Sequence, residues 1–239
     1  MPKVSKRISA LREKVDPLKT YPVDEAIGLV KELATAKFDE TVELHIRTGL
    51  DGRHAEQQLR GSVVLPHGIG KEVTVAVFAE GEAATAAQNA GADIVGGDDL
   101  IARVAGGFTD FDVAISQREL MGKVGALGRV LGPRGLMPNP RNNTVLGAED
   151  MAHGVEEAKA GRVDFRIDRS NLIHVILGKV SFTPEQLRDN LRAMVTEIER
   201  NRPSGAKGEL IRGVSITSTM GPGINLDLQA LKAAAAASS

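Results

Sequence analysis

The residues with the clearest chemical character lie in one segment, residues 121–148, which reads MGKVGALGRVLGPRGLMPNPRNNTVLGA. This segment holds four cations and no acidic residue, although the whole chain has a net charge of −1 at pH 7. Its recurring glycines and prolines interrupt any long helix or central strand, which predicts a shaped loop. Exposed cations on such a loop suit phosphate groups and favour a nucleic-acid partner. The residues that define this signature loop are Lys123, Gly128, Arg129, Gly132, Pro133, Arg134, Gly135, Pro138, Pro140 and Arg141.

Other interpretations of the signature loop remain open. A solvated, turn-rich connector is one, although a connector would usually mix in Asp, Asn and Ser. An α/β enzyme could use the loop on a phosphorylated substrate, which requires a pocket at strand ends with converging acids or histidines. A protein–protein scaffold could dock the loop on an acidic partner.

Enzyme motifs are missing from the sequence. It contains no G-x-G-x-x-G, G-x-S-x-G or H-E-x-x-H pattern. Gly70-Lys71 resembles only the end of a phosphate-binding P-loop, because Glu72 follows where Ser or Thr is needed. The five histidines lack metal-ligand spacing. We therefore expect no enzyme, no cofactor and no metal site.

The composition limits the compartment and the partners. With no Cys, disulfides and thiolate zinc sites are excluded and a reducing compartment fits. The N-terminus has no apolar core typical of a secretory signal, and no segment approaches the roughly 18 apolar residues of a membrane span. We expect a cytoplasmic protein without a membrane partner. Charge is uneven, because residues 1–12 are basic while residues 71–119 hold nine acids and three cations.

Two further segments could contact a polyanion. KFDETVELH (37–45) runs from a loop into a strand whose open face offers Thr41 and Glu43. Phe38 in this segment is either an apolar contact for a base or ribose or a core residue that closes the end of the sheet. TSTMGP (217–222) ends another strand in hydroxyls, Met, Gly and Pro, which suit ribose and phosphate contacts or form an ordinary strand-to-turn transition.

The pattern of elements predicts two domains. Both flanks combine amphipathic strands with one long helix, expected over residues 24–36 and 184–200. The middle alternates short buried strands with helices, which is typical of a parallel sheet. We expect an α/β protein with a discontinuous two-layer α+β domain (residues 1–68 and 160–239) and an inserted three-layer, Rossmann-like α/β domain (69–159). The strand at 211–220 is expected to be the last, and the tail KAAAAASS to be frayed.

Together these segments resemble one family, the bacterial large-subunit ribosomal stalk protein, which is protein number one of that subunit. The resemblance runs from about Lys14 to Asn225 and rests on AKFDETVELH (36–45), MGKVGALGRVLGPRGLMPNP (121–140), GKVSF (178–182) and TSTMGP (217–222). It implies the two-domain α/β fold described above. It also implies that the signature loop lies in the second domain and identifies the family without being the main RNA contact.

The resemblance further implies a set of partners and contacts. The partners are the ribosome, large-subunit rRNA, exit-site tRNA, whose release the mobile stalk assists, and the messenger RNA of its own operon, whose translation the protein represses. The free protein is expected to be a monomer. We expect shape recognition of folded RNA through hydroxyls, backbone groups and a few cations. The implied RNA-binding residues are Lys37, Phe38, Thr41, Glu43, Arg166, His174, Lys179, Ser181, Thr217, Thr219, Met220 and Gly221.

Overall fold

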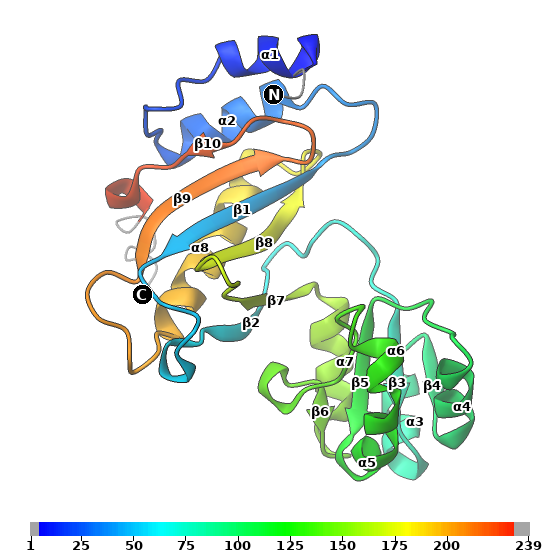
Figure 1. Cartoon of the computed structure of the whole chain (residues 1–239). Coiled ribbons are helices and arrows are strands. Elements are labelled where there is room, and N and C mark those ends of the chain that lie inside the picture. The colour runs from blue at the N-terminus through cyan, green and yellow to red at the C-terminus, as the bar shows by residue number, and fades with distance from the viewer. Residues whose placement is uncertain (1–4, 232–239) are drawn as a thin grey trace. The chain divides into compact units, whose positions relative to one another are not determined.

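The computed structural model describes residues 5–231 and divides the chain into two compact units (Figure 1). Unit 1 is Met1–Gly70 together with Val163–Ser239, and unit 2 is Lys71–Arg162. A discontinuous first unit and an inserted second one confirm the fold class that the sequence predicts. The tail for which we expect fraying lies outside the described residues.

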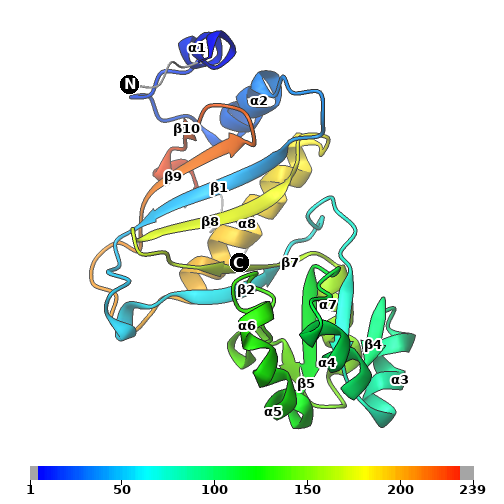
Figure 2. The same ribbon diagram turned by 45° about the vertical axis from the view of Figure 1, so that its right-hand side comes forward.

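Unit 1 is built on one antiparallel sheet with the strand order β10-β9-β1-β8 (Figure 2). Two helices, α2 and α8, cover one face of this sheet, and the described residues of unit 1 leave the other face uncovered. A separate pair of strands, β2 and β7, forms a second, two-stranded sheet. The elements are α1 (Lys6–Glu13), α2 (Val23–Leu33), β1 (Thr41–Thr48), η1 (Ala55–Gln57), β2 (Arg60–Val64), β7 (Arg162–Arg166), β8 (Leu172–Lys179), α8 (Pro184–Arg200), β9 (Ile211–Ser218) and β10 (Ile224–Asn225).

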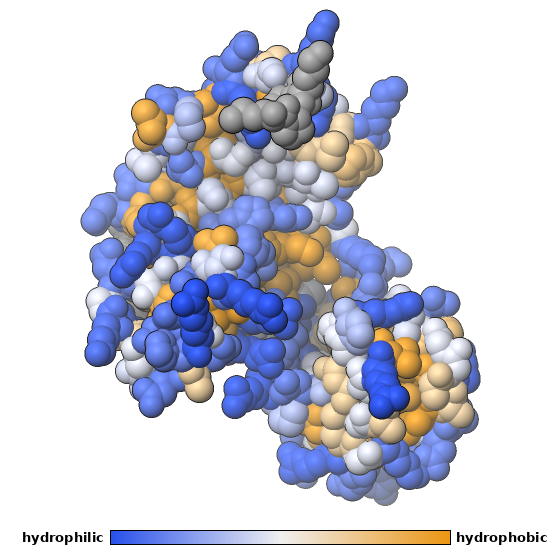
Figure 3. Space-filling view, viewed as in Figure 1, coloured by the Kyte–Doolittle hydropathy of each residue, from blue (hydrophilic) through white to orange (hydrophobic). Residues whose placement is uncertain are grey.

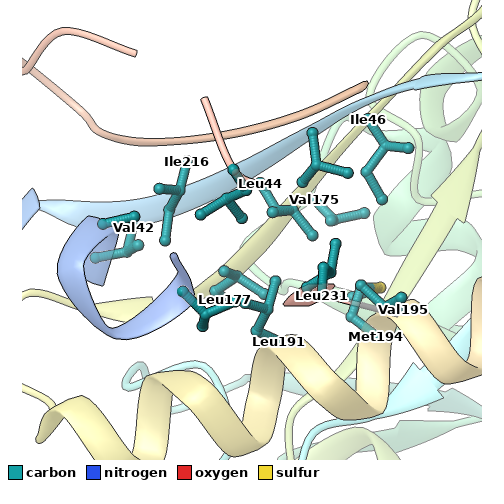
Figure 4. Close-up of a cluster of buried hydrophobic side chains, with 14 of the residues drawn as sticks. Val42, Leu44, Ile46, Val175, Leu177, Leu191, Met194, Val195, Ile216 and Leu231 are labelled. Atoms are coloured by element: carbon teal, nitrogen blue, oxygen red, sulfur yellow. The ribbon is translucent and has the colours of Figure 1, made fainter. Parts of the chain in front are cut away.

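The core of unit 1 follows from strand alternation. Val42, Leu44 and Ile46 on β1 point to one face and are fully buried. They pack towards the apolar side of α8, which supplies Leu191 and Met194 (Figure 4). Burial of each such side chain contributes about 1.5–3 kcal/mol to folding. The alternate β1 side chains, from Thr41 to Arg47, face outward, so the sheet keeps one polar, accessible surface.

The start of α8 confirms the predicted capping box. The Thr183 hydroxyl accepts a hydrogen bond from the Gln186 amide, and the Gln186 side chain accepts one from the Thr183 amide. Pro184 occupies the first helical position, where its missing amide hydrogen costs nothing. The helix ends at Arg200, before Pro203, as expected.

Unit 2 is a parallel sheet with the order β4-β3-β5-β6, covered by helices on both faces. α4 and the helical segments after β5 pack on one face, and α3 and α7 pack on the other. Each unit has its own apolar core. The elements are β3 (Val75–Phe78), α3 (Gly81–Asn89), β4 (Ile94–Gly96), α4 (Asp98–Ala105), β5 (Val113–Gln117), η2 (Arg118–Leu120), α5 (Met121–Val124), η3 (Gly125–Leu127), α6 (Gly128–Leu131), η4 (Pro140–Asn142), β6 (Val145–Leu146) and α7 (Met151–Lys159).

The structure contains short elements that the sequence patterns do not predict. α1, β2 and β10 are among them, and β10 shows that the expectation of a last strand at 211–220 is wrong. A two-residue strand such as β10 has no periodicity to detect, because it exists only through its pairing with β9. Within the described part of the chain, no helix combines the length and apolar character needed to cross a membrane.

Candidate nucleic-acid interface

Most of the implied RNA-binding residues lie at one end of the unit 1 sheet. Here the loop before β1, the turn after β8 and the turn after β9 meet. Thr41 is paired with Lys179 across β1 and β8, and Val42 is paired with Ser218 across β1 and β9. We call this group the loop cluster, and its members are Lys37, Phe38, Thr41, Lys179, Ser181, Thr217, Thr219, Met220 and Gly221.

A buried carboxylate that the sequence analysis did not select holds the loop cluster together. Glu40 is 1% exposed. One carboxylate oxygen accepts the Ala36 amide at 3.0 Å, and the other accepts the Ser218 hydroxyl and the Met220 amide, both at 2.8 Å. The side chain therefore ties the loop before β1 to the turn after β9. The only indication of Glu40 in the sequence is its position, directly before the predicted strand and among other polar residues.

The charge on Glu40 is stabilised in place. Burial by itself raises the pKa of this carboxyl group, because the charged form loses water. The hydrogen bonds from Ala36, Met220 and Ser218, together with the positive charge of Arg7, outweigh burial and hold the pKa of Glu40 below its ordinary value. Glu40 is thus ionised at neutral pH, and charge-assisted hydrogen bonds are the strong kind.

Asp39 and Lys31 fix the third segment of the cluster. The Asp39 carboxylate accepts the Ser181 amide at 3.1 Å and the Ser181 hydroxyl at 2.8 Å. The Lys31 ammonium group donates to the carbonyl oxygens of Val180, at 2.7 Å, and Phe182. All three segments are therefore pinned by charged groups, which pre-organises the surface that they present.

The hydroxyls of the cluster are partly committed to the protein. The Thr219 hydroxyl accepts the Thr41 amide at 2.9 Å, and the Thr41 hydroxyl accepts the Lys179 ammonium group at 2.9 Å. The Thr217 hydroxyl donates to the turn, with the Gly221 carbonyl at 3.3 Å among its acceptors. The Thr217 hydroxyl thus keeps only its acceptor capacity for RNA, so fewer hydroxyl groups of this turn are free than its sequence indicates.

Gly221 is required by the turn itself. A Cβ atom at this position would lie 2.6 Å from the Ser218 hydroxyl oxygen, which is the oxygen that donates to Glu40. Any side chain here would displace Ser218 and disturb the carboxylate contact.

Two large apolar side chains stand exposed at the cluster. Phe38 is 56% exposed and Met220 is 46% exposed. The alternative that Phe38 is a core residue closing the sheet is therefore wrong. The Glu40 carboxylate accepts the amide of Met220 itself and the amide of Ala36, two residues before Phe38. An exposed aromatic ring and a thioether on a rigid frame can stack against bases or ribose.

Glu43 and His174 lie further along the open face. Glu43 is paired with Thr217 on one side and Ile176 on the other. The Nε2 atom of His45 lies 3.8 Å from the Glu43 carboxylate. Among the described residues, no Lys or Arg forms an ion pair with Glu43. His45 and His174 are directly opposed, with their Nδ1 atoms 2.7 Å apart.

The histidine pair predicts a pH dependence of stability. Burial lowers the pKa of His45, and the neighbouring His174 lowers it further, while Glu43 opposes them. Because the folded state disfavours the proton, stability is complete above the ordinary histidine pKa of about 6.5 and falls as the pH drops through it. We expect chemical denaturation of His45→Gln to show a shallower loss of unfolding free energy between pH 7.5 and 5.5 than the parent. His54→Gln, at an exposed site, should keep the parental slope, and an unchanged slope in His45→Gln would contradict this account.

Arg166 lies apart from the loop cluster. It is the last residue of β7, whereas the cluster forms at the start of β1 and the end of β8. The loop cluster contains another cation, which the sequence analysis did not include among the RNA-binding residues. Arg7 on α1 donates to the Met220 carbonyl at 2.9 Å and to the Thr35 hydroxyl at 3.1 Å. Its only signal in the sequence was the basic N-terminus.

The signature loop is not a loop throughout. Residues 118–131 form the short consecutive helical segments η2, α5, η3 and α6, and irregular backbone begins only at Gly132. Short 3₁₀ and α turns tolerate glycine because Leu120, Val124, Leu127 and Leu131 anchor them to the core of unit 2.

Two of the four cations of the signature loop have partners within unit 2. Lys123 is bound to Asp98 at 2.6 Å, and Arg134 donates to the Thr109 hydroxyl. The surface over α5 and α6 is pale and tan with scattered blue side chains, rather than uniformly hydrophilic (Figure 3). All four cations are nevertheless exposed, as the sequence predicts, and the structure adds only that Lys123 and Arg134 have partners within unit 2.

Comparison with known proteins gives consistent relationships. Residues 30–222 match the model of the "Ribosomal protein L1p/L10e family". A protein named "Large ribosomal subunit protein uL1" from Dehalococcoides mccartyi is 55% identical over 92% of this chain and 92% of its own length. Proteins of the same name from Chloroflexus aurantiacus and Thermus thermophilus are 54% and 51% identical, each over 95% of this chain, and over 96% and 99% of their own lengths.

Proposed function

Because the chain belongs to the ribosomal protein L1p/L10e family, we propose that its unit 1 binds a folded segment of large-subunit rRNA through the loop cluster. The chain is a structural constituent of the large ribosomal subunit of the bacterial kind and a cytoplasmic ribosome component. Members of this family are structural proteins and not enzymes. The alternative of an α/β enzyme acting on a phosphorylated substrate is therefore dropped.

One observation supports this placement most strongly. The Glu40 carboxylate joins two chain segments and leaves Phe38 and Met220 exposed beside them. An exposed aromatic or apolar side chain held in a fixed position is a surface on which RNA bases can stack. Lys37 and Arg7 add positive charge nearby, and the backbone turns add polar groups. Apolar platforms, hydroxyl acceptors and a few cations fit folded RNA, which proteins recognise by shape, stacking and ribose contacts.

We extend the proposal to the wider role of the protein. The bound rRNA and this protein form a mobile stalk that assists release of deacylated tRNA from the exit site. The same loop cluster binds a similar fold in the messenger RNA of its own operon and represses translation. Because both RNAs bind the same loop cluster, we expect the rRNA and the messenger RNA to compete for the protein. The free protein acts as a monomer.

A binding measurement tests the proposal. A gel-shift series with large-subunit rRNA fragments of increasing length should reveal a minimal folded fragment that binds specifically, with affinity falling as salt rises. The slope should be about −0.9 per duplex phosphate neutralised. An operon leader transcript should compete for the same protein. Equal affinity for all fragments and for unrelated RNA would contradict specific recognition.

Deletion of unit 2 gives a separate prediction. The cores of the two units share no residue, so unit 1 should fold without residues 71–162 when a flexible linker joins Gly70 to Val163. We expect the shortened protein to keep rRNA affinity within a few-fold of the full chain, since the loop cluster lies wholly in unit 1. Circular dichroism establishes folding before the gel shift. A folded but inactive product would move the site out of the loop cluster.

A further inference from the structure

A second basic site lies on unit 1, away from the loop cluster. Arg60, Arg166 and Arg169 line one cleft of about 340 Å³, together with Gln58 and Asp168. Arg60 begins β2, Arg166 ends β7, and Arg169 follows in the turn before β8. Two chain segments, the start of β2 and the end of β7 with the turn that follows it, thus bring three guanidinium side chains to one hollow. We call this site the arginine cleft.

The positive charge of the arginine cleft is not neutralised within the protein. Among the residues that the structure describes, no carboxylate forms an ion pair with Arg60, Arg166 or Arg169. All three are exposed. Like charges gathered in one hollow repel each other, so an anion that enters it gains from all three at once.

Asp168 cancels only part of this charge, and its carboxylate is bound to the turn. One oxygen accepts the Ser170 amide at 2.8 Å and the Leu172 amide at 2.7 Å, and the other lies 3.7 Å from Nε2 of His174. The carboxylate shapes the turn that presents Arg169. With three cations and one acid, the residues lining the cleft have a net charge of about +2.

The chemistry of the lining indicates the class of ligand. Guanidinium groups form paired hydrogen bonds with phosphate oxygens, and several of them together select a phosphate-rich ligand. The low share of apolar residues gives no platform for a base or an aromatic ligand. The cleft is therefore suited to a phosphodiester backbone rather than to a nucleobase.

The place of the cleft in the fold connects it with the proposed RNA site. The turn with Arg169 reaches the far end of β1, where the Thr48 amide donates to the Asn171 carbonyl at 3.0 Å. The loop cluster lies at the other end, around Thr41. Seven residue steps of about 3.3 Å separate these ends by about 23 Å. A folded RNA that extends over about this distance can reach both.

We propose that the arginine cleft is a second anchor that binds the phosphodiester backbone of the same folded RNA that contacts the loop cluster. This inference rests on the proposed function. The loop cluster recognises the shape of the RNA, and the arginine cleft adds phosphate contacts that set its orientation along the sheet.

Charge-removing variants of the full chain test the proposal. The triple variant Arg60→Gln, Arg166→Gln, Arg169→Gln is compared with a matched control that removes three exposed arginines of unit 2, Arg118→Gln, Arg129→Gln and Arg141→Gln. Binding of a specific rRNA fragment is measured at several salt concentrations. We expect the cleft variant to bind at least 30-fold more weakly at low salt and to lose about 2–3 units of the salt slope, at about 0.9 per phosphate. The control should change neither quantity appreciably.

The length of the RNA and a small anion separate the possible outcomes. A truncated fragment too short to reach both sites should bind the cleft variant and the parent equally, whereas the long fragment should discriminate. An unchanged affinity and slope with the long fragment, in a variant with parental circular dichroism, would overturn the proposal. Thermal stabilisation by millimolar pyrophosphate together with unchanged RNA binding would overturn it as well, because the cleft would then be a small-anion site. If Met220→Asp loses RNA binding and the cleft variant binds like the parent, the second anchor alone is refuted. If neither variant changes RNA binding, the proposed function is refuted.

Discussion

Met220→Asp is expected to weaken binding of the specific rRNA fragment about 100-fold, which corresponds to roughly 2.7 kcal/mol. The substitution removes an exposed apolar side chain from the loop cluster and places a carboxylate where RNA phosphates approach. A lost stacking contact is worth about 1–3 kcal/mol, and charge repulsion adds to it. The Met220 amide still reaches Glu40, since that contact uses the backbone. The protein should therefore stay folded while affinity falls, as measured by gel shift and thermal melting.

Leu18→Asp is the matched control for this change. Leu18 is 92% exposed on unit 1 and belongs to no part of the loop cluster, so the same exchange of an apolar group for a carboxylate should leave RNA affinity within about two-fold. Phe38→Asp should resemble Met220→Asp. If Met220→Asp and Phe38→Asp both bind like the parent, the exposed apolar pair has no part in recognition and the loop cluster is not the RNA site.

Glu40→Gln is expected to lower the free energy of unfolding of unit 1 by about 3 kcal/mol at pH 7. The amide keeps the volume of the carboxylate but replaces one acceptor oxygen by a donor group. That group then faces either the Ala36 amide or the Ser218 and Met220 donors. The melting temperature of unit 1 should fall by roughly 6–12 °C. RNA affinity measured well below that temperature should still fall about ten-fold, because the two segments are no longer joined.

The effect of Glu40→Gln depends on pH with a definite sign. The pKa of Glu40 is lowered in the folded state, so its contribution is complete above the unfolded value of about 4.3. The contribution disappears as the pH falls through the lowered folded value. The difference in unfolding free energy between parent and variant should therefore be largest near pH 7 and shrink below about pH 4. Urea denaturation at pH 7, 5 and 3.5 measures it.

Glu13→Gln provides the control for the loss of one carboxylate. Glu13 is exposed at the end of α1, and its removal should change the unfolding free energy by less than about 0.5 kcal/mol. A Glu40→Gln protein with parental stability at pH 7, or a difference that grows on acidification, would mean that the buried carboxylate does not hold the loop cluster together.

The two long helices and the main strands could be read from local signals. Apolar side chains at alternating positions define β1, and a capping box with Pro at the first position defines the start of α8. Such signals depend only on residues that are close together in the chain. They can therefore be recognised in the sequence without knowledge of the tertiary structure. The helix α1 was not predicted, because it buries only Leu11 and has almost no apolar stripe.

The signature loop shows where local reasoning fails. Its glycines disfavour helix by about 1 kcal/mol each relative to alanine, which predicts a loop. The structure nevertheless has helical turns there, because Val124, Leu127 and Leu131 gain more by burial in the core of unit 2. The lack of acids correctly marked the segment as unusual. Ion pairing of Lys123 with Asp98, a residue far away in sequence, removed part of the expected positive surface.

The sequence by itself determined the fold class, the two-unit organisation and, through motifs spread along most of the chain, the family. These properties rest on periodicity, caps and residue order, all of which are encoded locally. Only the tertiary structure decided that Glu40 joins segments 180 residues apart. It also decided that Arg166 lies beside Arg60, about a hundred residues earlier in the chain, and not in the loop cluster. Long-range hydrogen bonds and charge clusters leave no mark on any short stretch of residues, because they arise only when folding brings distant segments to one place.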